Sequence, residues 1–291
     1  MTKDMFGNDR YKVGLHIHTT CSDGHVSPED AARIYRSAGF DAIALTDHWY
    51  FTESGELDGM PIISGCEYNL GATDTIDGVM HIVGLGMEYD PKIVRATATR
   101  QEVIDKINAS GGLAVLAHPA WSLNKPSDAM ELSGFAATEI YNSVSNAHQS
   151  SRPYSGAFVD LLANEGVAYP LIATDDAHYY DGSDETLSYI MVKADNLDTK
   201  ELLRAIKAGD FYATQGPELH VRRDGNRMIV DCSPCVMIDF LSNSAWADGR
   251  ITRGSDLTHA EYEIKPWEKW VRVEVHDADG KSAWSNVFMI K

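Results

Sequence analysis

The chain has 291 residues, of which 44% are hydrophobic, so it can bury a large core as one α/β domain or a domain with an appendage. Its formal net charge of −18 argues against extended contact with a nucleic-acid backbone, because such contact needs clustered Lys and Arg. No apolar run approaches the roughly 20 residues that cross a bilayer, and the polar start lacks the apolar stretch of a signal peptide. We therefore expect a cytoplasmic protein without a membrane partner.

Seven apolar runs follow one another along the chain, and each is typical of a strand buried on both faces. The runs are 12–18, 41–48, 61–67, 80–86, 112–119, 137–142 and 169–178. Helical patterns lie between or after them, at 27–39, 96–110, 151–165 and 199–208. Ser27 suits the N-cap of the first helix and Pro28 its first position. This alternation predicts a parallel sheet, and seven strands suggest that the sheet closes into a barrel.

The pattern changes after about residue 215. Turn signals at 224–225 and 279–280 separate segments in which polar and apolar residues alternate. We therefore predict two domains, a barrel over 8–215 and a small antiparallel β unit over 216–291. The tryptophans expected to anchor this unit on the barrel are Trp267, Trp270 and Trp284.

Histidines and carboxylates stand at the ends of the predicted strands. His16 and His18 are two residues apart in "GLHIH", so on a strand their side chains point the same way. Taken alone, this pair fits two partly buried histidines bonded to backbone carbonyls as well as it fits a metal site. The other candidates are His48, Glu67, His118, Asp176 and His178 at strand ends, and His81 at a strand start. Because a parallel barrel gathers its carboxyl strand ends at one mouth, we predict a site there for several metal ions.

The order of short motifs resembles the PHP (polymerase and histidinol phosphatase) domain family of metal-dependent phosphoesterases. Between residue 14 and about residue 180 the chain carries H-x-H-T-x-x-S-D-G, L-T-D-H, G-x-E, H-I-x-G-L-G, A-H-P, E-I-Y-N and D-D-A-H. The resemblance implies a distorted seven-stranded β/α barrel that holds up to three metals. The tail from "GPEL" to "AWSN" is also similar to relatives that hydrolyse esters and carbamates, which leaves the substrate class open.

The resemblance also assigns the ligands. The first metal would take His16, His18, Glu67 and Asp176; the second Glu67, His81 and His118; the third Asp23, His48 and His178. Many relatives carry histidine near the position of Asp23, so two metals or three are both expected possibilities. Imidazole and carboxylate ligands without thiolate suit Zn, Mn or Fe, and the order of affinities does not choose among them.

Clustered divalent ions predict hydrolysis. A water that bridges the metals loses its proton near neutral pH and can attack phosphorus or a carbonyl carbon. The candidates for protonating the leaving group are Asp23, His178 and a metal-bound water. Asp47 and His48 are adjacent and face opposite ways, so we expect one to bind metal and the other to orient the surrounding groups.

Two further residues are predicted to contact the substrate. Arg152 follows the loop after the 137–142 strand, and its guanidinium can pair with two phosphate oxygens at once. The alternative is an ordinary solvated arginine at a helix start. Asn142 shares this loop and is the second candidate.

These observations favour a phosphoesterase that hydrolyses a small phosphorylated substrate with a metal-bridging hydroxide. A hydrolase of carboxylic esters, amides or carbamates could use the same metals, and the scarcity of Lys and Arg near the motifs speaks for it. The third reading is a non-catalytic metal-binding or regulatory module. The oligomeric state stays open.

Overall fold

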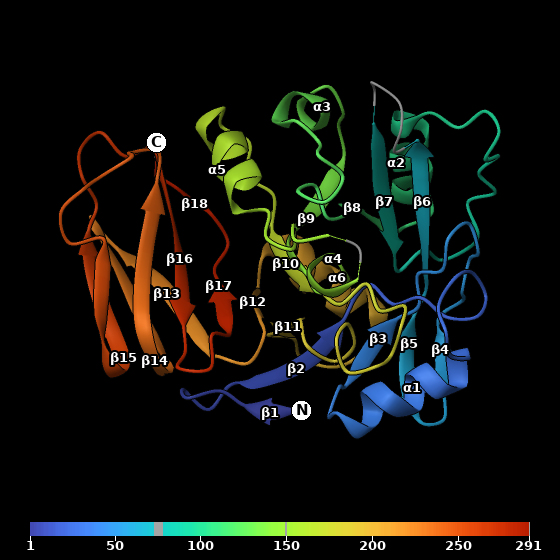
Figure 1. The fold of residues 1–291 in the computed structure, drawn as a ribbon, viewed down its shortest axis with the longest axis horizontal. Helices are drawn as coiled ribbons and strands as arrows, with labels where there is room; N and C mark the ends of the chain where they lie inside the picture. The colour runs from blue at the N-terminus through green and yellow to red at the C-terminus, as the bar shows by residue number, and fades with distance from the viewer. Residues whose placement is uncertain (73–77, 149, 291) are drawn as a thin grey trace.

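The computed structural model describes residues 1–72, 78–148 and 150–290 (Figure 1). Its strands form two sheets, one of 13 strands and one of five. In the described ranges, every helix is too short or too polar to reach across a bilayer.

The first part of the chain builds the parallel centre of the larger sheet. β2 (Asp9–Gly14), β3 (Ala42–Ala44) and β5 (Met60–Ile63) pair in parallel, with β4 (Gly55–Leu57) antiparallel beside β5 and β1 (Thr2–Lys3) beside β2. α1 (Pro28–Ser37) connects β2 to β3. As predicted, Ser27 is its N-cap, because the Ser27 side chain accepts the backbone N–H of Asp30 at 3.1 Å. Tyr35 on the buried face packs into the core.

The smaller sheet has the order β10-β9-β8-β7-β6. Its strands are β6 (Gly65–Gly71), β7 (Val79–Leu85), β8 (Leu113–Leu116), β9 (Phe135–Asn142) and β10 (Leu171–Thr174). The helices along this part of the chain are α2 (Arg100–Ala109), α3 (Pro126–Met130), α4 (Val144–Ala147) and α5 (Gly156–Asn164). The expected helices at 96–110 and 151–165 are thus present as α2 and α5, but both begin later than predicted.

The two sheets do not close into a seven-stranded barrel within the described residues. The consecutive strands β5 and β6 belong to different sheets. The isolated bridges between the sheets in the described residues are Ile17 with Ala177, His48 with Glu67 and Thr52 with Gly65. β6 and β7 pair antiparallel, because a connection as short as that from Gly71 to Val79 has no room for a crossover helix. The α/β class is therefore confirmed, and the closed barrel is corrected to two bridged sheets.

Two strands that the sequence did not predict extend the larger sheet beyond β2. β11 (Tyr189–Val192) pairs antiparallel with β2, and β12 (Phe211–Thr214) pairs with β11. α6 (Thr199–Ala208), which was predicted, connects them. β12 also pairs with a late strand, β17 (Ser282–Trp284), so the sheet continues into the C-terminal residues.

The C-terminal strands are antiparallel, as the turn signals predicted. They are β13 (Leu219–Asp224), β14 (Arg227–Ser242), β15 (Ile251–Glu263), β16 (Trp270–His276), β17 and β18 (Phe288–Met289). Of these, β13 to β16 stand at one end of the molecule, at the left in Figure 1. The division into domains at 215/216 stays a prediction, because the sheet is continuous there.

Two of the three predicted tryptophan anchors are buried. The Trp270 indole donates to Asn164 Oδ1 of α5 at 3.0 Å, and Trp284 stacks on Tyr141 of β9 at 5.3 Å between ring centroids. Trp267 is 59% exposed, so its expected role as an anchor is wrong. Trp267 lies in the connection between β15 and β16, so it is not part of a strand that would direct its ring toward the core.

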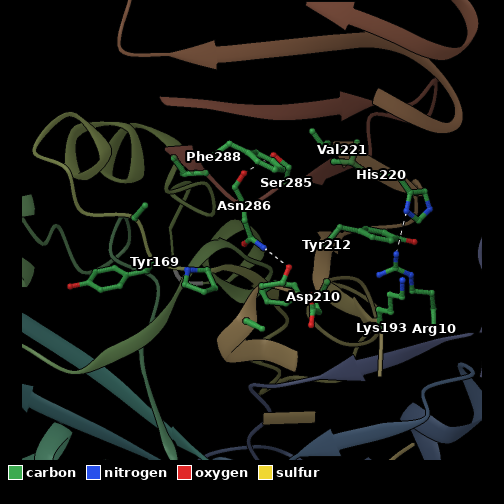
Figure 2. A pocket seen from close by; sticks show the side chains of 17 residues that line it. Arg10, Tyr169, Lys193, Asp210, Tyr212, His220, Val221, Ser285, Asn286 and Phe288 are labelled. Carbon is green, nitrogen blue, oxygen red and sulfur yellow. Dashed lines mark hydrogen bonds between the residues drawn. The ribbon is translucent and has the colours of Figure 1, made fainter. Parts of the chain in front are cut away.

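A cavity of about 430 Å³ lies where the C-terminal strands meet β2 and β12 (Figure 2). Its polar side chains bond largely to groups of the protein. Arg10 donates to Asp4 at 3.0 Å and lies 3.4 Å from the His220 ring nitrogen, while Asn286 donates to the Gly209 carbonyl at 3.0 Å. The contacts of Arg10 with His220 and of Asn286 with Gly209 connect the C-terminal strands to the earlier part of the larger sheet.

Candidate metal centre

Most metal-ligand candidates lie just beyond the ends of strands, whereas Glu67 and His81 lie within β6 and β7. His16 and His18 follow the end of β2 and flank Ile17, which is bridged to Ala177. The backbone N–H of His18 donates to the Ala177 carbonyl at 3.0 Å, and that of Asp176 donates to the His16 carbonyl at 2.9 Å. Residues 16–18 and 176–178 are thus held side by side, which brings the first and last candidates of the chain together.

The first group consists of His16, His18, Glu67 and Asp176, all buried. His18 Nε2 lies 3.1 Å from Glu67 Oε2 and 3.1 Å from Asp176 Oδ1. His16 Nε2 lies 3.3 Å and 3.1 Å from the same two oxygens. Asp176 Oδ1 is buried and accepts no hydrogen bond. Two imidazole nitrogens and two carboxylate oxygens around one point form a donor set that suits a divalent ion.

Glu67 extends the centre toward a second group. Its Oε1 lies 2.7 Å from His81 Nδ1 and 3.4 Å from His118 Nε2, while its Oε2 lies 3.1 Å from His48 Nδ1. Donor atoms of His48, Glu67 and His81 all lie within 4.8 Å of one another. His118 Nε2 is also 3.7 Å from Asp176 Oδ2. Glu67 is therefore placed to bridge two ions, although His48 competes with His118 for a place at the second.

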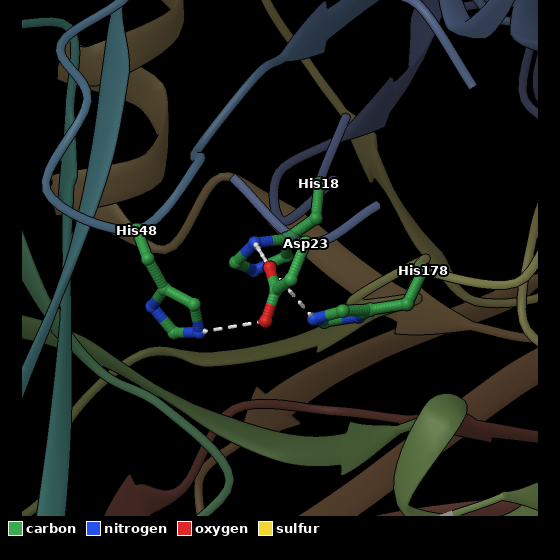
Figure 3. A group of neighbouring side chains, drawn as sticks. All are labelled: His18, Asp23, His48 and His178. Atoms are coloured by element: carbon green, nitrogen blue, oxygen red, sulfur yellow. Dashed lines mark ion pairs between the residues drawn. The ribbon is translucent and has the colours of Figure 1, made fainter. Parts of the chain in front are cut away.

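Figure 3 shows the third group, in which Asp23 lies between three imidazoles. Asp23 Oδ1 is 3.4 Å from His18 Nδ1 and 3.5 Å from His178 Nε2, and its Oδ2 is 3.7 Å from His48 Nε2. The Asp23 side chain is 55% exposed, which places this group on the solvent side of the centre. Each of these nitrogen–oxygen distances is longer than that of a strong hydrogen bond. Ligand atoms of a single ion would be spaced in this way.

The carboxylates at the centre stay ionised. Burial would raise the pKa of Glu67, but the facing imidazoles, His81 above all, outweigh it and hold that pKa well below its usual range. Burial likewise opposes protonation of His16, yet Asp176 and Glu67 raise the pKa of His16 well above its usual value. Protons on the imidazoles and bound divalent cations are two ways of balancing the same buried negative charge. The residues therefore fit a metal centre.

The pKa of His48 is shifted the other way. Burial lowers the pKa of His48 to about 4, so its imidazole is neutral near pH 7 and has a lone pair to donate. Its buried Nδ1 has no hydrogen-bond partner. His178 has a lowered pKa for the same reason, burial, and its Nδ1 lies 2.6 Å from the Asp176 carbonyl. An N–H at Nδ1 directed to that carbonyl leaves Nε2 unprotonated on the side of Asp23.

Glu139 of β9 is a residue that the sequence analysis missed. It is 1% exposed, and its Oε1 lies 2.7 Å from His16 Nδ1. Its Oε2 accepts the backbone N–H of His118 at 2.8 Å and an Asn142 amide hydrogen at 2.9 Å. A carboxylate behind an imidazole fixes the ring and its tautomer, so that Nε2 faces the metal. The available signal was a single acidic residue inside the apolar strand "ATEIYN".

Asn142 was predicted as a substrate contact, and its amide is occupied inside the protein. Nδ2 donates to Glu139 and, at 3.1 Å, to Asp176 Oδ2. Oδ1 accepts the N–H and the hydroxyl of Ser145, at 3.2 and 2.7 Å. Asn142 therefore holds the ligand candidate Asp176 in place. Its amide has no hydrogen-bonding group left for a direct contact with substrate.

Arg152 is exposed, near the start of α5. Its backbone N–H donates to the Ser145 carbonyl at 3.3 Å and to the Ser150 hydroxyl at 3.2 Å. These bonds fix the backbone and leave the direction of the guanidinium unspecified. Its role as a phosphate clamp stays a prediction.

Asp47 has the orienting place that was expected for one member of the Asp47–His48 pair. It is buried and accepts the backbone N–H and the hydroxyl of Thr19, both at 2.8 Å, and the Ser22 hydroxyl at 2.7 Å. These bonds fix the loop that carries Asp23. Asp184 does the same on the other side, because it accepts the backbone N–H of His178 at 2.7 Å.

Backbone strain also gathers at the centre. His118 and Asp176 have φ angles of 26° and 55°, in the left-handed region that residues with a Cβ seldom occupy. Such conformations persist where surrounding contacts over-determine them, and they are common at functional sites.

Comparison with known proteins addresses the fold. No protein-family model matches the chain. Among curated proteins, it is 28% identical over 120 residues to an uncharacterized protein of Methanocaldococcus jannaschii, a match that covers 37% of this chain and 67% of that protein. Among solved structures, it resembles a two-domain protein of Bacteroides vulgatus that contains a predicted PHP-like metal-dependent phosphoesterase. The TM-score is 0.55 at 14% identity, over 100% of this chain and 97% of that one.

The chain has a PHP-like fold. This confirms, at the level of the fold, the resemblance that the motifs carried. The chain is also similar to a lesion-specific endonuclease of Pyrococcus furiosus, with a TM-score of 0.48 at 16% identity over 69% of this chain and 56% of that one. Within the PHP-like fold, the histidines and carboxylates of the motifs gather in the centre described above.

Proposed function

We propose that this protein is a metal-dependent hydrolase of phosphoric esters that acts on a small phosphorylated substrate. The observation that carries the proposal is the convergence of imidazole and carboxylate side chains from six separate segments around Glu67 and Asp176. The proposed ligands are His16, His18, Asp23, His48, Glu67, His81, His118, Asp176 and His178. The PHP-like fold of a predicted metal-dependent phosphoesterase supports the same chemistry.

Two or three divalent ions, Zn, Mn or Fe, would occupy this centre. When bound, such ions supply Lewis-acid activation of water and of the phosphoryl group. The chain itself keeps the ligands in register: Glu139 orients His16, Asn142 holds Asp176, and their burial keeps bulk water away from these groups. Fixed dipoles and charges in a site that excludes water act more strongly than they would in solution.

Proton transfer to the leaving group is assigned to the exposed side of the centre. Of the two predicted side-chain donors, Asp23 has a side chain 55% exposed and His178 one only 9% exposed. A group that hands a proton to a departing alcohol must reach it directly or through one water. Asp23 reaches this side, but its pKa is lowered, because the imidazoles of His18, His48 and His178 outweigh burial, which would raise it. The Asp23 carboxylate is therefore ionised near pH 7 and would accept a proton rather than donate one. Of the three predicted donors we therefore favour a metal-bound water, which Asp23 and His178 would orient. Arg152 is the proposed partner of the substrate phosphate.

Carboxylic ester, amide or carbamate hydrolysis is the second candidate. The side chains that converge on Glu67 and Asp176 in the described ion pairs are imidazoles, with no Lys or Arg among them. A doubly charged phosphate would gain from such a cation, whereas a neutral ester would not need one.

The test is hydrolysis of p-nitrophenyl phosphate, bis(p-nitrophenyl) phosphate and p-nitrophenyl acetate with Mn²⁺ or Zn²⁺, each repeated with a chelator. We expect phosphate ester turnover that the chelator abolishes. His16→Ala should lower kcat/KM at least about 100-fold, because it removes one ligand of the buried group. His259→Ala, which changes an exposed histidine of β15, is the control and should leave turnover unchanged.

Turnover of the acetate alone would replace the first candidate by the second. Metal binding without turnover of any of the three esters would favour a regulatory module. A protein that binds no divalent metal, or a His16→Ala variant with full activity and an intact fold, would end the proposal.

A further inference from the structure

The metal centre opens to solvent on the side of His48 and Asp23. Among the nine ligand candidates these two have the most exposed side chains, at 19% and 55%, whereas the side chains of His16 and His18 are fully buried. A substrate therefore reaches the centre on this side, and the residues next to His48 form part of the rim that it passes.

Trp49 directly follows His48 and is fixed to β6 by two hydrogen bonds. Its backbone N–H donates to the Glu67 carbonyl at 2.9 Å, and its indole N–H donates to Asn69 Oδ1 at 2.5 Å. Asn69 comes two residues after Glu67 on β6, so both side chains are on the same face of the strand. The residue opposite Asn69 on β7 is His81. Asn69 therefore stands beside two ligand candidates.

Arg95 brings a positive charge to this rim. It is an exposed residue of the segment between β7 and α2. Its guanidinium carbon lies over the Trp49 ring, 5.4 Å from the ring centre, and one terminal nitrogen lies 3.5 Å from Asn69 Oδ1. A guanidinium that is attracted to the face of an indole keeps N–H groups at its edge for another acceptor. Trp49 and Asn69 thus hold the Arg95 side chain next to the metal centre.

The charge of Arg95 is not neutralised within the described part of the chain. Its contacts there are an indole ring and an amide oxygen, and no carboxylate lies within ion-pair distance. Lys92, on the same segment, is paired with Asp90 at 2.7 Å. An exposed arginine without an ion pair is common by itself. Arg95 differs because two side chains fix it at the entrance to a cluster of ligand candidates.

We propose that Arg95 binds an anionic group of the substrate at the rim of the metal centre. This inference rests on the proposed function and specifies its substrate as a charged molecule rather than a neutral ester. A guanidinium donates two parallel N–H groups to a phosphate or a carboxylate. Because the net charge of −18 repels anions, a cation at the entrance is needed to attract one. The group is either the ester phosphate or a second anionic group of the same molecule.

The first test measures binding, so that it does not depend on turnover. Protein loaded with Mn²⁺ is titrated in a calorimeter with phenylphosphonate, which has one anionic group, and with 4-phosphonobenzoate, which has two. We expect Arg95→Met to weaken the binding of at least 4-phosphonobenzoate about tenfold. Arg95→Lys keeps the charge but not the two parallel N–H groups and should lose about threefold. Equal losses for the two compounds assign Arg95 to the ester phosphate, and a loss for 4-phosphonobenzoate alone assigns it to the second group.

The second test is kinetic. For p-nitrophenyl phosphate or 4-carboxyphenyl phosphate, Arg95→Met should raise KM about tenfold and leave kcat nearly unchanged, because the contact lies away from the reacting atoms. Turnover of p-nitrophenyl acetate, a neutral ester, should be unaffected. Lys92→Met is the matched control, because it removes a paired and exposed cation of the same segment. It should behave as the unmodified protein in both tests.

The proposal is overturned if neither phosphonate binds, if Arg95→Met binds both as tightly as the unmodified protein, or if Lys92→Met loses as much affinity. Phosphate ester hydrolysis together with unchanged phosphonate binding in Arg95→Met would keep the proposed function and remove this inference. Phosphonate binding that depends on Arg95, without turnover of any phosphate ester, would support the anion site and contradict the proposed function. Circular dichroism of each variant checks the fold, and should Arg95→Met not fold, Arg95→Lys decides in its place.

Discussion

Glu67 is the residue on which the metal centre depends most. Its two oxygens lie within 3.4 Å of nitrogens from five histidines. Glu67 lies on β6, where its backbone forms the bridge to His48 that helps to connect the two sheets. Its side chain is the one placed between the first and second proposed metals. A shorter side chain at this position would leave the backbone bridge in place and would draw the carboxylate away from the imidazoles that it faces.

Glu139 gives a sharper test of positioning, because it touches ligands but is not one of them. Glu139→Gln keeps the shape and replaces the carboxylate behind His16 with a neutral amide. We expect the affinity for Zn²⁺ or Mn²⁺ to fall about 10- to 100-fold, as for other groups that orient metal-bound imidazoles. Titration calorimetry of metal-free protein measures this directly.

Glu261→Gln, an exposed change on β15, is the control for the loss of one negative charge. If Glu139→Gln binds metal as tightly as the control does, the bond to His16 has no positioning role.

At this scale the sequence predicts well what stands at strand ends. Seven of the nine ligand candidates were found that way, His81 was found at a strand start, and Asp23 was assigned only by the family resemblance. Glu139 was missed because it lies inside a run, where a buried carboxylate is visible only once its partners His16 and His118 are known. The occupied amide of Asn142 also depends on Asp176, which is 34 residues away.

Among the elements, the turn between β1 and β2 depends on one carboxylate. Asp4 accepts the backbone N–H groups of Phe6 and Asn8 at 3.0 and 2.8 Å and the Arg10 Nε–H at 3.0 Å. Burial would raise the pKa of Asp4, but the hydrogen bonds from Asn8 and Arg10 outweigh it and lower that pKa from 3.8 to about 2.

This lowered pKa predicts a pH dependence of stability. The contribution of ionised Asp4 is fully present above the unfolded pKa, near 4, and is lost as the pH falls toward the folded pKa, near 2. Its full size is about 2 kcal/mol. In urea unfolding at several pH values, the difference between the unmodified protein and Asp4→Asn should therefore shrink as the pH falls from 5 to 2.

Asn8→Ala removes some of the donors to Asp4 and should show an intermediate effect. A difference between the unmodified protein and Asp4→Asn that is the same at pH 5 and pH 2 would contradict the assignment.

The start of α1 was easier to predict than the partners of the strands, although α2 and α5 begin later than predicted. The start of α1 follows from the local pair Ser27 and Pro28. β11 and β12 were missed because their place depends on pairing with β2 and β17, which lie far away in the chain. The closed barrel was expected because apolar runs can be recognised from neighbouring residues alone. The separation of β5 from β6 cannot, because it depends on which sheet each strand joins.

At the scale of the whole molecule, a buried arginine links the C-terminal strands to α5. Arg272 of β16 binds Asp160 of α5 with two nitrogens and also bonds to Glu274 and to Tyr154. Its side chain is almost inaccessible to solvent. The network connects the C-terminal strands to the helix that precedes β10.

Arg272→Met should cost about 3–5 kcal/mol of unfolding free energy, because it leaves buried carboxylates without their partner. Arg204→Met, which removes an exposed pair with Glu201, should cost far less, because solvent screens exposed ion pairs. Guanidinium chloride unfolding compares the two variants. Equal losses would show that Arg272 does not link the strands to α5.

The double pairing of β12 has a consequence for any attempt to shorten the protein. β12 is bonded to β11 on one side and to β17 on the other. A truncation after residue 215 would keep every proposed metal ligand but strip β12 of one neighbour, and the open edge would invite aggregation. A minimal soluble fragment with an intact metal centre must therefore retain β17, which lies near the far end of the printed sequence.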